Sequence, residues 1–569
     1  MAQPAPNTPP RKTFDVCIVG SGAAGGMAAK VLTEGGLDVV MLEAGPLLNP
    51  GLHYTEHLWP YNLPHRGVGI GAGGYNSTAS HEFDVANIVQ DVPGEPYSNG
   101  PGSAFRWTRA RLLGGRTNHW NCVTLRFSPH DMRTRSLSGY GEDWPVEYND
   151  IAPYYDKVES LIGVYGSREG IPSAPDGVFL PPPAPRCSDL LVRKGAAKLK
   201  VPCIAGRAAI VTRAHNGRPP CHYCAQCTQG CRTASSFSSS QVLIPPALKT
   251  GRLQIIPMAM ARQVLVARDG KAAGVSYIDK TTRTEQRVLA KVVWLGASAC
   301  ESARLLLNSR STLFPNGLAN SSGTVGRYLM ESVATTVTGA FPELNRIPPH
   351  NHDGTGSVHV YIPWWKYDRR NDFQGGYHAE VFGGPGMPRA RMFHQVGLEA
   401  QGYGAALKEK CRETYGTGVQ LLGRGEMIPN PASYCEIDSN LLDQWGIPTL
   451  RFHLKWSDNE IKMAKDMRQS FEEILQAAGG KTNAAVPHPD FGHLSPGGVA
   501  HEVGTVRMGS DRQTSVLSGF CQAHDVKNLF VSDAGCFTTG PDKNPTLNIL
   551  ALTWRAAEYA LDQARKGDL

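Results

Sequence analysis

Four of the thirteen cysteines lie within eleven residues: Cys221, Cys224, Cys227 and Cys231. Their spacing, C-x2-C-x2-C-x3-C, is the one that bacterial ferredoxins use to bind an iron–sulfur cluster through thiolates. The other cysteines are scattered singly, so composition does not explain this density. We therefore expect these residues to bind a cluster of the 4Fe–4S or 3Fe–4S type.

Other ligands remain open for this cysteine run. Structural zinc usually needs two separated C-x2-C pairs, and the chain has no second pair. Free thiols or disulfides are a third alternative, although disulfides between such close cysteines are strained. The run also departs from ferredoxin, because Arg232 rather than proline follows Cys231. Either all four thiolates bind one 4Fe–4S cluster, or three bind a 3Fe–4S cluster and one is spare.

A glycine-rich turn near the N-terminus predicts a nucleotide site. Residues 14–19 (FDVCIV) form an apolar run typical of a buried parallel strand, and GSGAAG follows directly. In this G-x-G-x-x-G pattern the first glycine permits a tight turn, the second lets a pyrophosphate approach, and the third allows close helix–strand packing. The free N–H groups of the following helix can bind phosphate. The candidate residues are Gly20, Gly22, Ala23, Ala24 and Gly25.

A second strand at residues 39–42 ends in Glu43, which is placed to bind a ribose hydroxyl. The small residues after it, beginning with Ala44, favour FAD over NAD. A glycine-rich turn without any ligand is the alternative, but strand, helix and acid together predict dinucleotide binding.

Later segments fit the same domain. We expect strands at residues 253–256, 261–267, 273–278 and 291–295 and a helix at 302–307. We include Ala261, at the start of the second of these strands, among the cofactor contacts. The FAD-binding domain is therefore predicted to be discontinuous along the chain.

The length of 569 residues predicts two domains in an α/β fold. We assign residues 10–160, 205–325 and 488–569 to a Rossmann-type FAD-binding domain with a cysteine-rich insert at 218–234. Residues 161–204 and 326–487 then form a sheet-and-helix substrate-binding domain. Aromatic residues of the second domain, such as Trp364 and Tyr377, suit sugar stacking but suit a sheet core better.

The net charge of +7 is small for this length, and no basic block indicates nucleic-acid binding. No apolar run approaches the roughly 18 residues that span a bilayer. The proline-rich N-terminus carries no export signal, which predicts a cytoplasmic protein, or a periplasmic one exported together with a signal-bearing partner subunit.

The N-terminal unit, the LGGRTNHW segment at residues 113–120 and the block at 501–552 resemble the glucose–methanol–choline (GMC) oxidoreductases. The cysteine run and the TNHW segment look closest to bacterial sugar dehydrogenase large subunits of the glucoside 3-dehydrogenase and gluconate 2-dehydrogenase types. Other segments are similar to pyranose 2-oxidase. The resemblance implies the GMC fold and FAD-dependent oxidation of an alcohol.

The resemblance also implies the roles of single residues. His501 and Asn544 match the catalytic pair: the histidine takes the hydroxyl proton while the flavin N5 accepts a hydride, and the asparagine orients the hydroxyl. Asp533 and Ala534 match a turn beside the ribityl–phosphate part of FAD, and Thr546 begins a helix near the flavin. A polar structural role is the alternative for His501, and an ordinary turn or helix cap for Asn544.

The LGGRTNHW segment supplies further predicted flavin contacts: Gly114, Gly115, Asn118, His119 and Trp120. The similar histidine of pyranose 2-oxidase is bonded covalently to the flavin. The TNHW version predicts a noncovalent FAD here, and simple packing of the loop is the alternative for His119 and Trp120.

Together these features predict a dehydrogenase that oxidises a secondary ring hydroxyl of a sugar or glycoside to a ketone. A cluster beside a flavin would pass single electrons to a partner, which we expect to be a cytochrome or a quinone-linked acceptor, and we also expect a small subunit. The alternatives are an O₂-using sugar oxidase, an enzyme for another polyol or a sugar acid such as gluconate, and a non-catalytic subunit of an electron-transfer complex.

Overall fold

The computed structural model describes residues 12–59, 62, 88–89, 94–348, 354–367, 371–385, 396, 403–482 and 496–569. The predicted domain limits at residues 10 and 488 lie outside these ranges, as do residues 1–11 of the N-terminal segment. The domain boundaries stay a prediction.

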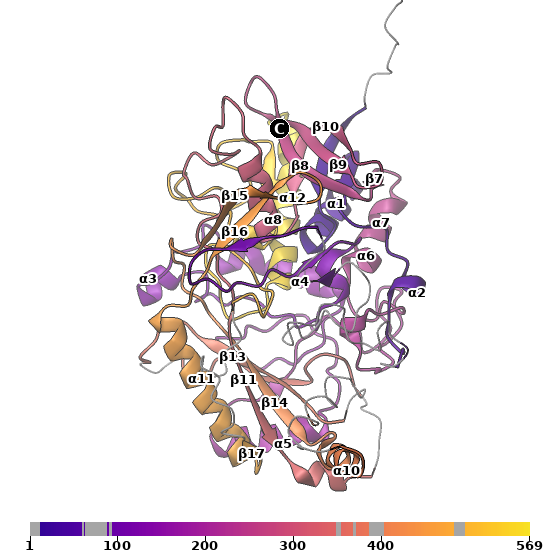
Figure 1. Ribbon diagram of the computed structural model, residues 1–569, viewed down its shortest axis with the longest axis vertical. Coiled ribbons are helices and arrows are strands. Elements are labelled where there is room, and N and C mark those ends of the chain that lie inside the picture. The colour runs from indigo at the N-terminus through magenta and orange to yellow at the C-terminus, as the bar shows by residue number, and fades with distance from the viewer. Residues whose placement is uncertain are drawn as a thin grey trace, which may run out of the picture.

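A mixed sheet occupies the upper part of the molecule in Figure 1, and seven of the described strands form it. The order is β7 (Leu253–Ile256), β2 (Val39–Leu42), β1 (Thr13–Val19), β10 (Thr284–Leu295), β9 (Ala272–Asp279) and β8 (Ala259–Val266), with β18 (Leu529–Val531) also on β10. Strand β1 pairs in parallel with β2 and β10, whereas β8, β9 and β10 are antiparallel. Both faces of β2 and of most of β1 are covered, so their sequences are apolar runs.

The predicted strand–turn–helix–strand unit is confirmed, and with it the α/β fold. The strand predicted at 39–42 has those bounds, and the helix after the glycine turn is α1 (Ala23–Glu34). Strand β10 is longer than predicted, because its first half pairs with β9 and only its second half with β1.

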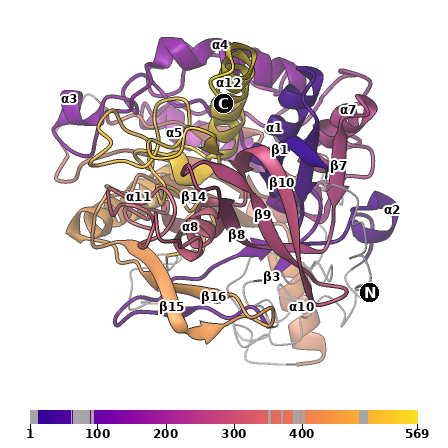
Figure 2. The same ribbon diagram turned by 90° about the horizontal axis from the view of Figure 1, so that it is seen from above.

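Helices surround this sheet. They are α4 (Tyr148–Ile162), α6 (Ser239–Val242), α7 (Ile244–Lys249), α8 (Ala299–Asn308) and α12 (Thr546–Lys566). The last of them packs against both α1 and α4, and Figure 2 shows these three helices side by side. Gly567 follows its last residue as the C-cap, and the left-handed φ of +76° there suits glycine.

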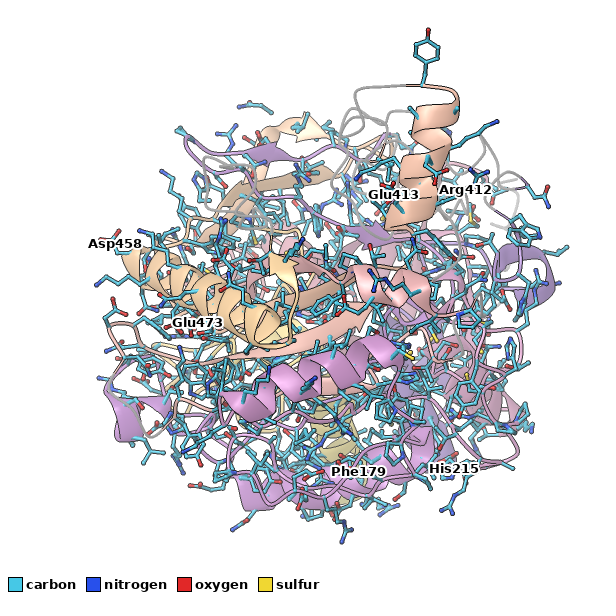
Figure 3. The ribbon with its side chains drawn as sticks, turned by 90° about the horizontal axis from the view of Figure 1, so that it is seen from below. Phe179, His215, Arg412, Glu413, Asp458 and Glu473 are labelled. Atoms are coloured by element: carbon cyan, nitrogen blue, oxygen red, sulfur yellow. The ribbon has the colours of Figure 1, made fainter. Side chains whose placement is uncertain are left out.

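A second sheet, with six described strands, lies in the lower part of Figure 1. Its order is β17 (Lys481–Thr482), β11 (Val333–Ala340), β14 (Gly418–Gly425), β13 (Tyr377–Gly383), β12 (Val360–Ile362) and β6 (Ile204–Ala205). Helix α11 (Asp458–Ala477), which carries the labelled Asp458 and Glu473 in Figure 3, crosses this sheet beside α5 (Cys187–Lys198). The close approach needs Gly423, because a Cβ there would lie 2.5 Å from the sulfur of Met467.

Smaller elements complete the described chain. A third sheet joins β15 (Tyr434–Leu442), β16 (Pro448–His453) and β4 (Ser98–Asn99), and β3 (Ile88–Val89) pairs with β5 (Arg109–Ala110). The short helices are α2 (Pro50–His53), α3 (Thr134–Ser138), α10 (Ala405–Thr414), η3 (Gly115–Asn118), η4 (Cys227–Gln229), η5 (Pro342–Arg346) and η6 (Ala534–Cys536). Among the described residues, no helix combines the length and the apolar character needed to cross a membrane.

Candidate active site

The glycine turn between β1 and α1 leaves its backbone open. Gly20 has a φ of +91°, and a Cβ on Gly25 would lie 1.9 Å from the Gly20 carbonyl oxygen. A Cβ on Gly22 would meet nothing within 4 Å. The first and third glycines thus allow close packing, while the middle one leaves space in front of the N-terminus of α1.

A second glycine turn faces this space. Gly114 has a φ of +94°, and its N–H donates to the Ser21 hydroxyl at 2.8 Å. A Cβ added to Gly115 would lie 3.5 Å from the Cα of Gly22. Two turns without side chains therefore face each other, and this cradle fits the pyrophosphate of a dinucleotide such as FAD.

Glu43 lies at the end of β2, as the nucleotide pattern requires. Its carboxylate accepts hydrogen bonds from the Ser21 hydroxyl and, at 2.8 Å, from the Gly45 N–H. Burial raises the pKa of Glu43. The adjoining Ala44 carbonyl accepts a bond from Lys280 at 3.0 Å. Glu43 thus joins the strand end to the turn, and its predicted ribose contact stays a prediction.

Asn118, His119 and Trp120 follow the second turn. The Asn118 amide is used within the protein, since its oxygen accepts from the Tyr54 hydroxyl at 2.9 Å and its nitrogen donates to two main-chain carbonyls. The indole of Trp120 donates to the Phe237 carbonyl at 2.9 Å. Burial lowers the pKa of His119 to about 3, so its ring is neutral. These side chains shape the loop, and their predicted contacts with the flavin stay predictions.

His501 lines a small cavity, together with Phe127, Lys543 and Pro545. Its Nδ1 lies 3.1 Å from the hydroxyl of Ser332. Burial, followed by the positive charge of Arg424, lowers the pKa of His501 to about 3. The ring is therefore neutral near pH 7 and able to accept a proton.

Glu331 holds the loop that carries His501. One carboxylate oxygen accepts the Gly497 N–H at 2.9 Å, and the other accepts the N–H groups of Val499 at 3.0 Å and His501 at 3.4 Å. Burial raises the pKa of Glu331 to about 7. Our sequence analysis missed Glu331 and the adjacent Ser332, although a lone acid in the apolar run before β11 was a usable signal.

Asn544 lies beside the same cavity, because its neighbours Lys543 and Pro545 line it. Its Nδ2 donates to Glu380 at 3.0 Å, while Oδ1 is buried and has no hydrogen-bond partner among the described residues. The structure thus brings both predicted catalytic residues to one place. The unpartnered oxygen is the kind of group that a substrate hydroxyl can satisfy.

A buried ionic network supports Asn544. Glu380 lies 3.7 Å from His378 and 3.6 Å from Arg424. Burial opposes ionisation of Glu380, but the charge of Arg424 and the hydrogen bond with His378 lower its pKa to about 2. Sequence analysis missed this network, whose signal was two ionisable residues at alternate positions of the otherwise apolar β13.

Lys543 continues the network between two carboxylates. Its Nζ lies 2.6 Å from Asp542 and 2.9 Å from Asp131. Lys543 also lines a second small cavity, whose walls include Tyr361 and Trp364. The two cavities therefore share Lys543 in their walls.

The remaining predicted cofactor residues are distributed as follows. Asp533 accepts hydrogen bonds from Ser302 at 2.5 Å and from the Ser298 N–H at 3.1 Å, so it caps the start of α8. Burial raises the pKa of Asp533 to about 6. Ala534 is buried in η6, Thr546 is the first residue of α12, and Ala261 pairs with Tyr277 between β8 and β9. The contacts of these residues within the protein do not test whether they contact FAD, so those contacts stay predictions.

The segment from Cys221 to Cys231, called the cysteine loop below, has thiols that accept hydrogen bonds from main-chain N–H groups. Cys221 Sγ accepts the Tyr223 N–H at 3.3 Å, and Cys231 Sγ accepts the Ser236 N–H at 3.5 Å. Tetrahedral zinc would hold its thiolates about 3.8 Å apart, given a Zn–S bond near 2.3 Å. In the described part of the chain, no three cysteines have thiols within 4.8 Å of one another. Zinc bound by this run alone therefore fits poorly, whereas a cluster of several irons separates its thiolates more widely.

A fifth cysteine, which the sequence analysis missed, lies with this loop. Cys122 is buried, and burial together with the charges of Cys231 and Cys221 raises its pKa. Burial and the charge of Cys122 likewise raise the pKa of Cys227. Cys122 follows Trp120 by two residues, so the cysteine loop adjoins the predicted flavin loop.

Two family models described as GMC oxidoreductase match residues 15–330 and 429–553, more than half of the 569 residues. The chain belongs to the GMC oxidoreductase family. It is an oxidoreductase that binds FAD and acts on alcohol groups, and the fold and family predictions are confirmed.

Known members resemble this GMC oxidoreductase along most of their length. The 2-methyl-1,2-propanediol dehydrogenase of Mycolicibacterium austroafricanum is 29% identical over 554 residues, covering 96% of this chain and 94% of that protein. The fructose dehydrogenase large subunit of Gluconobacter japonicus is 26% identical over 584 residues, covering 97% and 98%. The structure of a formate oxidase variant from Aspergillus oryzae shares the fold, with a TM-score of 0.67, 14% identity and coverage of 98% and 100%.

Proposed function

We propose that this GMC oxidoreductase is a dehydrogenase that oxidises a secondary ring hydroxyl of a sugar or glycoside to a ketone. Its electrons would leave through an iron–sulfur cluster to a partner, either a cytochrome or a quinone-linked acceptor. The observation that carries the proposal is a neutral histidine, His501, at a cavity beside the unsatisfied amide oxygen of Asn544.

The two residues divide the work on the substrate hydroxyl. If Nδ1–H of His501 donates to Ser332, the Nε2 lone pair is available to take the hydroxyl proton. The Nδ2 of Asn544 is bound to Glu380, so its Oδ1 is the atom left to orient the hydroxyl. Bound FAD supplies the acceptor for the hydride from the alcohol carbon.

A sugar suits the surroundings of this pair. The second cavity combines the aromatic side chains of Tyr361 and Trp364 with the charged Arg126 and Lys543. Aromatic faces complement the C–H face of a pyranose, and charged groups hydrogen-bond its hydroxyls. The likeness to the fructose dehydrogenase large subunit supports the same substrate class.

The cysteine loop supports the electron route. It adjoins the predicted flavin loop through Cys122 and through the Trp120–Phe237 hydrogen bond. A flavin accepts two electrons and a cluster passes one at a time, so a cluster here would serve a one-electron partner. We also propose a small subunit as part of this electron-transfer complex.

The test is an anaerobic titration of the purified holoenzyme with a methyl glucoside, followed by flavin absorbance, electron paramagnetic resonance and an iron assay. We expect the flavin to bleach and a cluster signal to change. Iron-free protein whose flavin still bleaches would refute the relay alone. A flavin that no sugar in a broad panel bleaches would refute the substrate class.

An O₂-using sugar oxidase is the second candidate, because the C-glycoside 3-oxidase of Arthrobacter globiformis is 24% identical over 573 residues. The two functions differ in their product under air. Stoichiometric hydrogen peroxide from sugar and air would favour the oxidase, whereas turnover only with an added one-electron acceptor would favour the dehydrogenase.

A further inference from the structure

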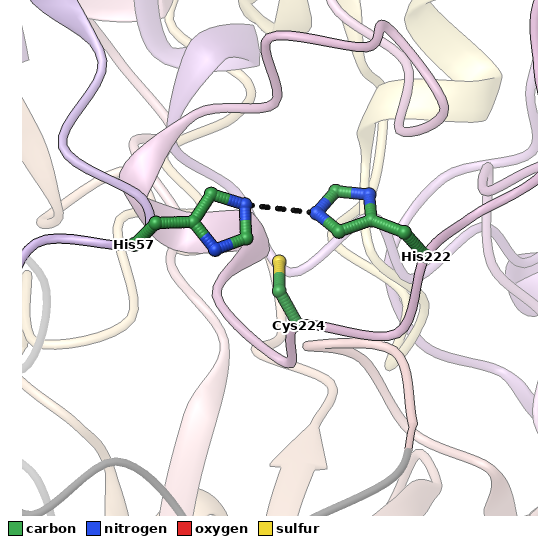
Figure 4. Close-up of side chains that lie close together, drawn as sticks. All are labelled: His57, His222 and Cys224. Carbon is green, nitrogen blue, oxygen red and sulfur yellow. Dashed lines mark hydrogen bonds between the residues drawn. The ribbon is translucent and has the colours of Figure 1, made fainter.

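Two histidines meet at the edge of the cysteine loop. The Nε2 atoms of His57 and His222 are 2.9 Å apart, although 165 residues separate them in the chain (Figure 4). Cys224 Sγ completes a group whose three ligand atoms all lie within 4.8 Å of one another. Both histidines are exposed and the cysteine is half-buried, so solvent and ions can reach the group.

Hydrogen bonds attach the segment of His57 to the loop that carries His222. The N–H of His57 donates to the Gln226 side chain at 3.0 Å. Arg232 donates its N–H to Glu56 at 2.7 Å and its guanidinium to the Tyr54 carbonyl at 2.8 Å. The segment before His57 is thus attached to the cysteine loop on both sides of η4.

The backbone around the three ligand atoms is strained. His57 has a φ of +71°, and Tyr223 and Ala225, on either side of Cys224, each have a φ of +58°. Residues other than glycine rarely adopt this left-handed backbone conformation. Such conformations persist where surrounding contacts enforce them, and they concentrate at ligand-binding sites. Ala225 is held in this way by its N–H bond to the Gly354 carbonyl at 3.1 Å.

A buried carboxylate lies near the three ligand atoms. Glu56 is buried, its Oε1 lies 3.7 Å from the guanidinium of Arg232, and its Oε2 has no hydrogen-bond partner in the described part of the chain. Its negative charge acts on both His222 and Cys224. Two imidazole nitrogens, a thiol and a nearby carboxylate are the kinds of group that bind a divalent metal ion.

We propose that His57 Nε2, His222 Nε2 and Cys224 Sγ bind one Zn²⁺, with water as the fourth ligand. Imidazole and thiolate are the ligands that zinc prefers, and three protein ligands leave one open position. On binding, Cys224 releases its thiol proton to solvent and no electrons are transferred. The ion connects the segment of Tyr54, whose hydroxyl binds Asn118 of the predicted flavin loop, to the cysteine loop.

This assignment divides the cysteine run between two metal sites. Cys224 belongs to the zinc, and Cys221, Cys227 and Cys231 remain for the cluster, with Cys122 beside them. The division rests on the proposed function, because it presumes a cluster. The zinc site itself does not depend on a cluster.

The test measures zinc, iron and FAD in the same samples of holoenzyme, after equilibration with Zn²⁺ and removal of loosely bound metal. The variants are His57→Ala combined with His222→Ala, Cys224→Ser, and Cys227→Ser. His130→Ala, which changes another exposed histidine, is the matched control. Zinc K-edge X-ray absorption of the wild type identifies the ligands. FAD content and thermal unfolding show that each variant is folded.

We expect one zinc per chain in the wild type and in His130→Ala, with one sulfur near 2.3 Å in the absorption spectrum. The double histidine variant and Cys224→Ser should lose the zinc and keep their iron, whereas Cys227→Ser should keep its zinc. A wild type with no more zinc than the double variant would overturn the proposal, as would loss of iron in Cys224→Ser with zinc unchanged. If the wild type contains no iron, the cluster hypothesis fails. The comparison of zinc contents between the wild type and the variants still decides the zinc proposal.

Discussion

Asn544 donates its amide Nδ2–H to Glu380, a carboxylate on the second sheet, at 3.0 Å. This hydrogen bond orients the amide so that its Oδ1 faces away from Glu380. The same carboxylate lies 3.6 Å from Arg424, on the neighbouring strand. The substrate-facing oxygen of Asn544 is thus set by a charge network that belongs to the sheet.

We predict that Glu380→Gln lowers kcat more than it changes KM. A glutamine can present its own amide N–H to Asn544, which removes the preference for one amide orientation and leaves Arg424 without its carboxylate. Misplacement of an orienting group costs about 10²-fold in rate. Steady-state kinetics with FAD content as reference measures the loss. Glu285→Gln, at an exposed site on β10, is the control, and an unchanged kcat would contradict the role of Glu380.

His501 gives a pH prediction. Because burial and Arg424 lower its pKa to about 3, it stays deprotonated at all higher pH values of practical interest. Its protonation should therefore add no acid limb to the profile of kcat/KM near the ordinary histidine pKa of about 6.5. His501→Asn should lower kcat by about 10²–10⁴-fold, the usual share of a general base. A limb near 6.5 in the wild type that disappears from the residual activity of His501→Asn would contradict the lowered pKa.

Local patterns allowed much of the first sheet to be predicted. The strand bounds at Leu253–Ile256 follow from an apolar run between turn residues, and the glycine turn follows from backbone requirements confined to a few residues. His501 and Asn544 were found through motif order, and the fold places His501 in the wall of a cavity that the neighbours of Asn544, Lys543 and Pro545, also line.

The partners of these residues could not be predicted in the same way. Glu331 lies just before β11 and Glu380 lies in β13, and each acts on a loop more than a hundred residues away in the chain. Cys122 and His57 approach the cysteine loop only through tertiary contacts. Their pairing depends on sheet register and loop packing, which no local spacing encodes.

Lys543 gives a stability prediction. Its charge lies between the buried carboxylates of Asp131 and Asp542, and Lys543→Met would leave both without it. Removing one partner of a buried ionic group costs about 3–5 kcal/mol. Urea unfolding of the holoenzyme near pH 7 measures the change, with Lys291→Met, at an exposed ion pair on β10, as the control. Equal stabilities for the two variants would contradict the network.

Glu331 predicts a pH-dependent contribution to stability. Burial raises its folded-state pKa to about 7, above the value of about 4.3 in an unfolded chain. Between these values the folded state holds the proton and the unfolded state has released it. The stabilisation is therefore complete below about 4.3 and is lost as pH rises through about 7.

In Glu331→Gln this part of the pH dependence is removed. The advantage of the wild type over the variant in free energy of unfolding should therefore be larger near pH 5 than near pH 8. Urea unfolding of the holoenzyme at both values measures it, and Glu285→Gln should show no such trend. An advantage that grows toward pH 8 would mean that the three N–H groups hold an ionised carboxylate. In that case charge-assisted hydrogen bonds would fix the loop of His501 at neutral pH. Glu331→Gln would then displace His501 most at pH values where the Glu331 carboxylate of the wild type is ionised.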